Sequence, residues 1–159
     1  MSFLLDTNVI SEARKPNWNP SVRAWLASVR GADLYLSALV VGEIRQGIER
    51  LHQRDAAQAE VYEAWLTRLR HDYADRILPI TADVAEEWGR MNVPGPVPAI
   101  GGLLAATAKV RGLTLVTRDA GAPAGPLRRL NCPEPAVPVA LALIARPSPG
   151  RERKAPRAG

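Results

Sequence analysis

Short apolar runs alternate along the chain with longer stretches in which apolar residues recur every three or four positions. Five of the short runs are typical of buried strands, and they cover residues 3–5, 34–36, 77–79, 114–116 and, with a weaker pattern, 128–130. Strands that alternate with helices favour a parallel sheet with helices on its faces. The pattern therefore predicts an α/β fold, with a parallel sheet flanked by helices in a single domain.

Five longer stretches have the spacing of amphipathic helices. Their apolar positions are Val22, Trp25, Leu26 and Val29; Leu39, Val40, Ile44, Ile48 and Leu51; Val61, Trp65, Leu66 and Leu69; Val84 and Trp88; and nearly every position of residues 100–111. Ser37 and Thr81 stand where N-caps are expected, and Pro20 follows Asn19 as a first-turn proline does. Gly112 is placed to end the last helix, which is apolar on all sides and should be buried.

Composition narrows the class of protein. The 159 residues are 47% hydrophobic and 23% charged, as in ordinary globular proteins, and we expect one domain over residues 1–132 and an extension over 133–159. The single cysteine, Cys132, excludes an internal disulfide framework and favours a reducing compartment, the cytoplasm. Asp6 interrupts the apolar stretch near the N-terminus, so no signal peptide is apparent. The best candidate for a membrane span, residues 137–145, is too short to cross a bilayer. We therefore expect a cytoplasmic protein without a membrane partner.

The formal net charge of +5 is concentrated at the C-terminus. Residues 146–159 contain five basic residues and one acidic residue, so this tail carries +4 and the rest of the chain about +1. The content of Pro, Arg and Gly predicts that the tail is disordered. Either it adds non-specific affinity for RNA or DNA, or it is a solvated extension, and composition leaves both interpretations open.

The candidate chemistry lies where the predicted strands end. The first strand stops at Asp6, Thr7 and Asn8, which are residue types that commonly cap helices, so capping is one interpretation of Asp6. Glu43 lies two turns into the helix after the second strand, and Asp119 follows the fourth strand. Because ligands bind beyond the carboxyl ends of the strands in such sheets, the other interpretation is one site that contains all three carboxylates.

Clustered carboxylates repel one another unless a cation neutralises them. Ligands that are all oxygen favour a hard ion, Mg²⁺ or Mn²⁺, and hydroxyl and amide groups flank the three acids at Thr7, Asn8, Ser37 and Thr117. Such an ion activates water and polarises a phosphodiester. The residues therefore point to metal-assisted phosphodiester hydrolysis.

Four segments carry a family resemblance. They read LLDTNVISEARKP, LYLSALVVGEIRQGIERL, DRILPI and GLLAATAKVRGLTLVTRD, in this order, within residues 3–131. Together they resemble the PIN-domain ribonucleases and, more closely, the VapC-type toxins of bacterial toxin–antitoxin pairs. The resemblance implies a parallel sheet wrapped by helices and a Mg²⁺ or Mn²⁺ site built from four acidic positions. Three of these positions fall on Asp6, Glu43 and Asp119.

The match continues around the metal site, with one departure. The polar residues that the family places around the metal fall on Asn8 and Thr117. Gly101 stands at the third acidic position, and no acid occurs between Glu87 and Asp119. The resemblance also implies RNA as substrate, a cognate antitoxin protein as partner and a homodimer, for which the Leu, Val and Trp content of the helices gives some support.

Other interpretations stay open. Arg14, Lys15 and Arg118 are candidates for contacts to RNA phosphate, or they are solvated surface charges. Without an acid at Gly101, the chain is either a weakened or inactive PIN-fold protein that mainly binds an antitoxin or RNA, or an active enzyme. A DNA nuclease is a third interpretation. The apolar faces of residues 22–29 and 39–51 either form a groove for an antitoxin segment or pack in the core.

Overall fold

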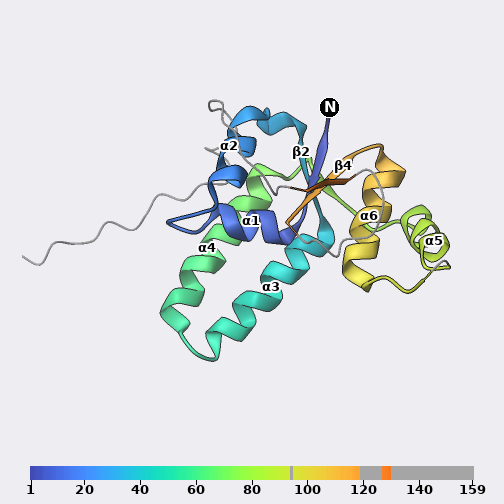
Figure 1. Cartoon of the computed structure of the whole chain (residues 1–159). Helices are drawn as coiled ribbons and strands as arrows, with labels where there is room; N and C mark the ends of the chain where they lie inside the picture. The colour runs from blue at the N-terminus through green and yellow to red at the C-terminus, as the bar shows by residue number, and fades with distance from the viewer. Residues whose placement is uncertain (94, 119–126, 130–159) are drawn as a thin grey trace, which may run out of the picture.

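The computed structural model describes residues 1–93, 95–118 and 127–129, within which five strands form one parallel sheet (Figure 1). In spatial order the strands are β3 (Ile77–Leu78), β2 (Leu34–Ser37), β1 (Phe3–Leu5), β4 (Thr114–Thr117) and β5 (Leu127–Arg129). Each neighbouring pair runs parallel. The predicted α/β fold is confirmed. The third strand ends one residue earlier than predicted, since Pro79 has no N–H for the ladder, and residue 130 lies outside the described part.

Six α-helices occur in the described part of the chain. They are α1 (Thr7–Ala13), α2 (Pro20–Ser28), α3 (Ala38–His52), α4 (Ala56–Asp72), α5 (Ala82–Met91) and α6 (Ala99–Arg111). Helices α2 to α6 are the five predicted ones. Helix α1 was not among them, because seven residues are too few to show a clear periodicity, and a short 3₁₀ helix at Gly31–Asp33 was also not predicted.

Local capping chemistry fixes where these helices begin and end. The side chain of Asn19 accepts hydrogen bonds from the backbone N–H groups of the first turn of α2. Ser37 and Thr81 cap α3 and α5 in the same way. Gly112 ends α6 in the left-handed region with φ of 64°, where a residue with a Cβ would be strained. These four predictions are confirmed.

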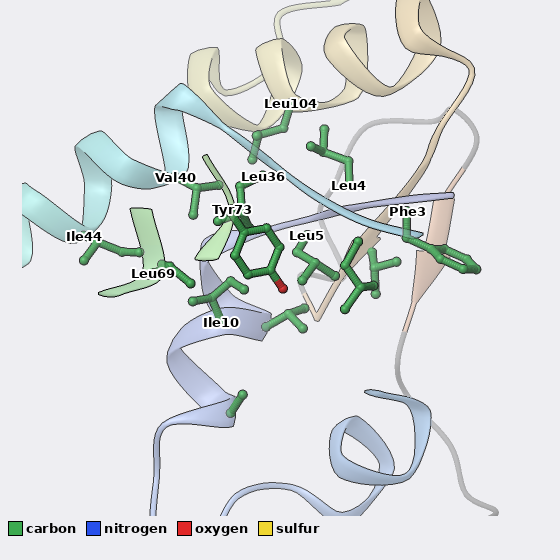
Figure 2. Packing of buried hydrophobic residues seen from close by; sticks show 14 of the residues in the cluster. Phe3, Leu4, Leu5, Ile10, Leu36, Val40, Ile44, Leu69, Tyr73 and Leu104 are labelled. Atoms are coloured by element: carbon green, nitrogen blue, oxygen red, sulfur yellow. The ribbon is translucent and has the colours of Figure 1, made fainter. Parts of the chain in front are cut away.

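Helices cover both faces of the sheet (Figure 1). Helix α6 lies on one face with α5 packed outside it, α1 and α2 lie on the other, and α3 and α4 form a long hairpin. The central strand β1 serves both layers: Leu4 projects toward Leu104 of α6, whereas Leu5 projects to the side of Ile10 (Figure 2). Phe3 meets Trp25 of α2 edge to face, with ring centroids 5.2 Å apart.

The contact between α5 and α6 depends on a glycine. A Cβ at Gly102 would lie 2.8 Å from Cδ1 of Trp88 and 2.8 Å from Cγ2 of Val97, closer than side chains approach. Glu87 of α5 also binds Nζ of Lys109 on α6. The two helices are thus joined by close packing and by charge.

Most of the predicted apolar positions form the core. In α2 and α3 the buried residues are Val22, Trp25, Leu26, Val40, Ile44 and Ile48. The structure therefore assigns these side chains to core packing and not to an open groove for a partner. No helix among the described residues is long and apolar enough to cross a membrane. The extension over 133–159 lies outside the described residues, so the predicted disorder of its tail, residues 146–159, stays a prediction.

Candidate functional site

The candidate site lies where the strand order reverses. The chain moves from β1 outward to β2 and β3 and then returns to place β4 on the other side of β1. In open parallel sheets the crevice beyond the carboxyl ends of two such strands is the usual ligand site. Asp6 directly follows β1, and its N–H donates to the carbonyl oxygen of Val116 at 3.0 Å, which extends the β1–β4 ladder by one bond. Thr117 is the last residue of β4.

The Asp6 side chain does not cap α1. Asp6 occupies the N-cap position with extended backbone angles, but its carboxylate accepts no capping hydrogen bond from the helix. Its Oδ2 instead accepts hydrogen bonds from Nδ2 of Asn8 at 2.7 Å and from Oγ1 of Thr117 at 2.6 Å. The capping interpretation is correct for the position of Asp6 and wrong for its carboxylate, which is held at the sheet edge.

Asn8 connects the carboxylate to the end of β4. Its Nδ2 also donates to Oγ1 of Thr117 at 2.9 Å, and its Oδ1 accepts from the backbone N–H of Arg118 at 3.0 Å. Thr117 is fully buried. Asp6, Asn8 and Thr117 therefore form a closed triangle of hydrogen bonds in which each side chain fixes the other two.

A second carboxylate reaches the same edge from α3. The hydroxyl of Thr7, the residue after Asp6, donates to Oε2 of Glu43. The buried Ser37, which also flanks the predicted site, caps α3 through its hydroxyl. The structure thus brings Asp6, Asn8, Thr117 and Glu43 together through direct hydrogen bonds or adjacent residues.

The other two acidic positions have different outcomes. Asp119 lies outside the described residues, so its predicted convergence with Asp6 and Glu43 stays a prediction. Gly101 is the third residue of α6, whose first turn contains no acid. Among the described residues, no three Asp, Glu, His or Cys side chains gather closely enough to hold a metal ion. The described part of the site therefore offers two carboxylates.

These two carboxylates are suitable ligands for a hard divalent cation. No residue in the described part of the chain donates a hydrogen bond to Oδ1 of Asp6 or to Oε1 of Glu43, so one oxygen of each carboxylate is available. Mg²⁺ commonly binds through one or two carboxylates and completes its shell with water and substrate phosphate. The donor chemistry fits Mg²⁺ or Mn²⁺ and does not fit a soft, thiolate-binding metal.

Glu12 is a residue that the sequence analysis missed. Its side chain is only 7% exposed, yet it is ionised in a cluster: Oε2 accepts from Nζ of Lys15 at 2.5 Å and from Nη1 of Arg118 at 2.7 Å. Oε1 accepts from the backbone N–H of Asn19 at 2.9 Å. The hydrogen bond from Lys15 is the largest cause that lowers the pKa of Glu12, against burial, which raises it. The Glu12–Lys15 spacing is readable in the sequence, but the partner 106 residues away is not.

The three predicted phosphate contacts have separate surroundings. The guanidinium of Arg14 lies over the rings of Tyr62 and Trp65, with its Cζ 3.5 Å and 4.1 Å from the ring centroids. Lys15 and Arg118 both bind Glu12. Arg14 therefore packs against α4, whereas Lys15 and Arg118 share one carboxylate, and their contact with phosphate stays a prediction.

Comparisons with known proteins identify a family and a matching fold. Residues 3–124 match the PIN domain family. The chain is 38% identical over 124 residues to the Toxin FitB of Neisseria gonorrhoeae, an alignment that covers 75% of this chain and 88% of that protein. It is 33% identical over 125 residues to the VapC ribonuclease Y4jK of Sinorhizobium fredii, with coverage of 74% and 86%. The crystal structure of FitAcB from Neisseria gonorrhoeae superposes with a TM-score of 0.70 and 38% identity, and covers 76% of this chain and 89% of that chain.

Proposed function

This chain belongs to the PIN domain family, and on that premise we propose that it is the toxin of a toxin–antitoxin pair and acts as a metal-dependent endoribonuclease. The reaction is the hydrolysis of RNA phosphodiester bonds. Two relatives support the proposal by their names, one as a toxin and one as a VapC ribonuclease. The partner that follows from the proposal is a cognate antitoxin protein, and we propose a homodimer in the cytoplasm.

The observation that carries the proposal is the carboxylate of Asp6. It stands at the start of a helix, where capping would be its ordinary role, but Asn8 and Thr117 bind its Oδ2 and hold it at the strand ends. An uncapped helix start forgoes a favourable interaction of about 1 kcal/mol. An acidic side chain kept from that role, at the edge of the sheet where ligands commonly bind, is typical of a functional carboxylate.

The proposed chemistry assigns a role to each described residue. Asp6 and Glu43, together with Asp119, would bind the ion. A bound Mg²⁺ or Mn²⁺ would supply an activated water and a polarised phosphoryl oxygen. Asn8 and Thr117 fix the orientation of Asp6, and Thr7 fixes Glu43, so that the carboxylates are positioned before substrate arrives.

A second candidate function is a weakened or inactive protein that mainly binds its antitoxin or RNA. It is favoured by one observation: α6 begins with no acid in its first turn, and Gly101 stands at the third acidic position of the family. Three carboxylates attract a divalent cation less than four do. Water can fill an open coordination position, but it cannot supply a fixed negative charge.

The first experiment compares the purified full-length protein with its Asp6→Ala variant on RNA, with Mn²⁺ and with EDTA. Cleavage that needs Mn²⁺ and falls by about 10³-fold in the variant is the expected result, since a ligand and preorganised charge are lost together. Glu86→Gln, an exposed carboxylate on α5, is the matched control and should cleave as the natural protein does. Equal cleavage by Asp6→Ala and the natural protein would exclude the proposed site.

The second experiment separates the two candidates with Gly101→Asp. Among the described residues only Gly112 has a positive φ, so the backbone at Gly101 accepts an aspartate. An aspartate there lies in the first turn of α6, where the helix dipole favours an anion. We expect Mn²⁺ affinity and cleavage to rise about tenfold or more. Strong natural cleavage with no gain in Gly101→Asp would show that the missing acid is unimportant, whereas cleavage seen only in Gly101→Asp would favour the inactive protein.

A further inference from the structure

Glu12 is the one deeply buried carboxylate of the described residues that the proposed mechanism does not use. We propose that Glu12 is a positioning residue for the site, which acts on Asp6 through Arg118 and Asn8. The proposal rests on the proposed nuclease function, but the contacts that carry it are independent of any metal or RNA. Three hydrogen bonds connect the four residues in series.

The first step is the pair of hydrogen bonds by which α1 binds the residue after β4. Asn8 and Glu12 are four residues apart, so they lie on the same face of α1, one turn from each other. Asn8 holds Arg118 by its backbone N–H, and Glu12 holds the same residue by its guanidinium. Two contacts at opposite ends of one residue fix its direction as well as its place, which a single hydrogen bond does not do.

The second step passes from Arg118 to the Asn8 amide. An asparagine amide can present either its oxygen or its nitrogen to a neighbour, and the surrounding donors decide which. Because the N–H of Arg118 occupies Oδ1 of Asn8, the nitrogen Nδ2 faces Asp6 and Thr117. If residue 118 moves away, Asn8 loses one of the contacts that set its orientation, and its hydrogen bond to Oδ2 of Asp6 is fixed less firmly.

The third step explains why a carboxylate is needed. Two cations, Lys15 and Arg118, share Oε2 of Glu12, and Oε1 accepts the N–H of Asn19 at the start of α2. A glutamine has only one acceptor oxygen, so it cannot serve both the cations and Asn19. The neutral residue must therefore release either the loop before α2 or Arg118, although its shape is nearly the same.

A merely structural role for Glu12 is the competing explanation, and Glu87 supplies the matched control. Glu87 also binds one lysine and one arginine, Lys109 and Arg90, but it lies on α5 and contacts none of the site residues. Glu12→Gln and Glu87→Gln therefore make the same chemical change in two similar clusters. Only Glu12→Gln should change the site.

The experiment measures kcat and KM for RNA cleavage with Mn²⁺ in the full-length protein, Glu12→Gln, Glu87→Gln, Arg118→Met and the double variant of Glu12 and Arg118. We expect Glu12→Gln to lower kcat by about 10- to 100-fold, as loss of supporting hydrogen bonds around a metal site does, with KM within about twofold. The double variant should lose no more than the worse single variant, because both act through one contact. Glu87→Gln should match the natural protein.

A second readout does not depend on activity. Amide hydrogen exchange of Arg118 should become faster in Glu12→Gln, while that of Leu113, which donates to Ala108, should stay unchanged. Mn²⁺ affinity, measured by electron paramagnetic resonance, should fall at least severalfold in the same variant. If the natural protein binds Mn²⁺ but does not cleave RNA, the proposed function fails, and these two measurements still decide the role of Glu12.

Three results would overturn the positioning role. An unchanged kcat, or for a protein without cleavage an unchanged Mn²⁺ affinity, would restrict Glu12 to holding the loop before α2. A raised KM that depends strongly on salt would mean that Glu12 orients Lys15 and Arg118 toward RNA phosphate. Equal losses of kcat or of Mn²⁺ affinity in Glu12→Gln and Glu87→Gln would show that both substitutions act by lowering the stability of the whole protein.

Discussion

Two carboxylates in different parts of the fold each bind the same types of residue. Glu12 in α1 and Glu87 in α5 each bind one lysine and one arginine, and their side chains are 7% and 13% exposed. In both, the hydrogen bond from the lysine is the largest cause of a lowered pKa. By composition and burial of the carboxylate, the two clusters are nearly equivalent.

The arginine partners make the difference, since Lys15, at 60% exposed, resembles Lys109. Lys109 and Arg90, which bind Glu87, are 57% and 66% exposed, so water can take over their solvation if the carboxylate is lost. Arg118, which binds Glu12, is 33% exposed and stands at the end of a central strand. We therefore expect the loss of stability on removing such a carboxylate to depend less on its own burial than on the burial and position in the fold of the cations that it binds.

The largest expected effect is that of Glu12→Ala on stability. The change leaves Arg118 partly buried without its carboxylate and removes the acceptor of the Asn19 N–H. We expect the free energy of unfolding to fall by about 2 kcal/mol, between the values for exposed and fully buried pairs. Urea denaturation measures it as a lower midpoint at an unchanged slope.

Glu87→Ala is the matched control for that prediction. Its melting temperature should stay within about 2 °C of the natural protein, because its cations are already largely solvated. An equal loss of stability in the two variants would contradict the comparison, because burial of the carboxylate alone would then decide the effect.

The next prediction tests whether packing holds α5 on α6 more firmly than the ion pairs of Glu87 with Arg90 and Lys109 do. Gly102→Ala places a Cβ 2.8 Å from the ring of Trp88 and from Val97, so these side chains must shift or the two helices must move apart. Overpacking of this kind typically costs about 1 to 2 kcal/mol, more than we expect from loss of Glu87. Thermal unfolding followed by tryptophan fluorescence would measure both variants, and a larger effect of Glu87→Ala would contradict the prediction.

The smallest effect concerns pH. The lowered pKa values of Glu12 and Glu87 mean that each contributes stability above the ordinary glutamate pKa and loses it as pH falls through the lowered value in the folded state. The melting temperature should therefore fall between about pH 5 and pH 3. Glu12→Gln should make this fall shallower at any salt concentration.

The salt concentration distinguishes the contributions of Glu12 and Glu87 when the melting temperature is measured against pH. Glu87→Gln should make the fall with pH shallower only at low salt, since its exposed cations are screened. The same acid-dependent loss in Glu12→Gln and in the natural protein would show that Glu12 does not contribute.

Much of the fold follows from local features of the sequence. Caps such as Ser37 and Thr81 and the terminating Gly112 act within one turn, so their partners are a few residues away and the pattern predicts them. Helix α1 was not predicted because seven residues offer less than two turns of periodicity, although Asp6 at its start is a residue type that commonly caps helices. Helix α1 packs against α2, α3 and β4, and the local sequence does not specify these contacts.

The candidate site was predictable only in part. The types and strand-end positions of Asp6, Asn8 and Thr117 are readable, because parallel strands bring their carboxyl ends to one edge. The role of Glu12 was not, since it depends on Arg118, and no local rule pairs residues so far apart in the chain. Arg14 and Lys15 are neighbours in sequence just after α1, yet one packs on aromatic rings and the other on a carboxylate, and nothing in the local sequence separates the two.

The span of the hydrogen bonds at the switch point has a consequence for the order of events in the cell. Thr117 and Asp6 are 111 residues apart, and Arg118 and Asn8 are 110 apart. A ribosome delivers β1 and α1 first, and a helix of seven residues is too short to be stable alone. Until β4 has been synthesised, the emerging chain therefore carries Asp6 without the strand that orients its carboxylate. The hydrogen bonds that orient Asp6 can therefore form only after β4 has been synthesised.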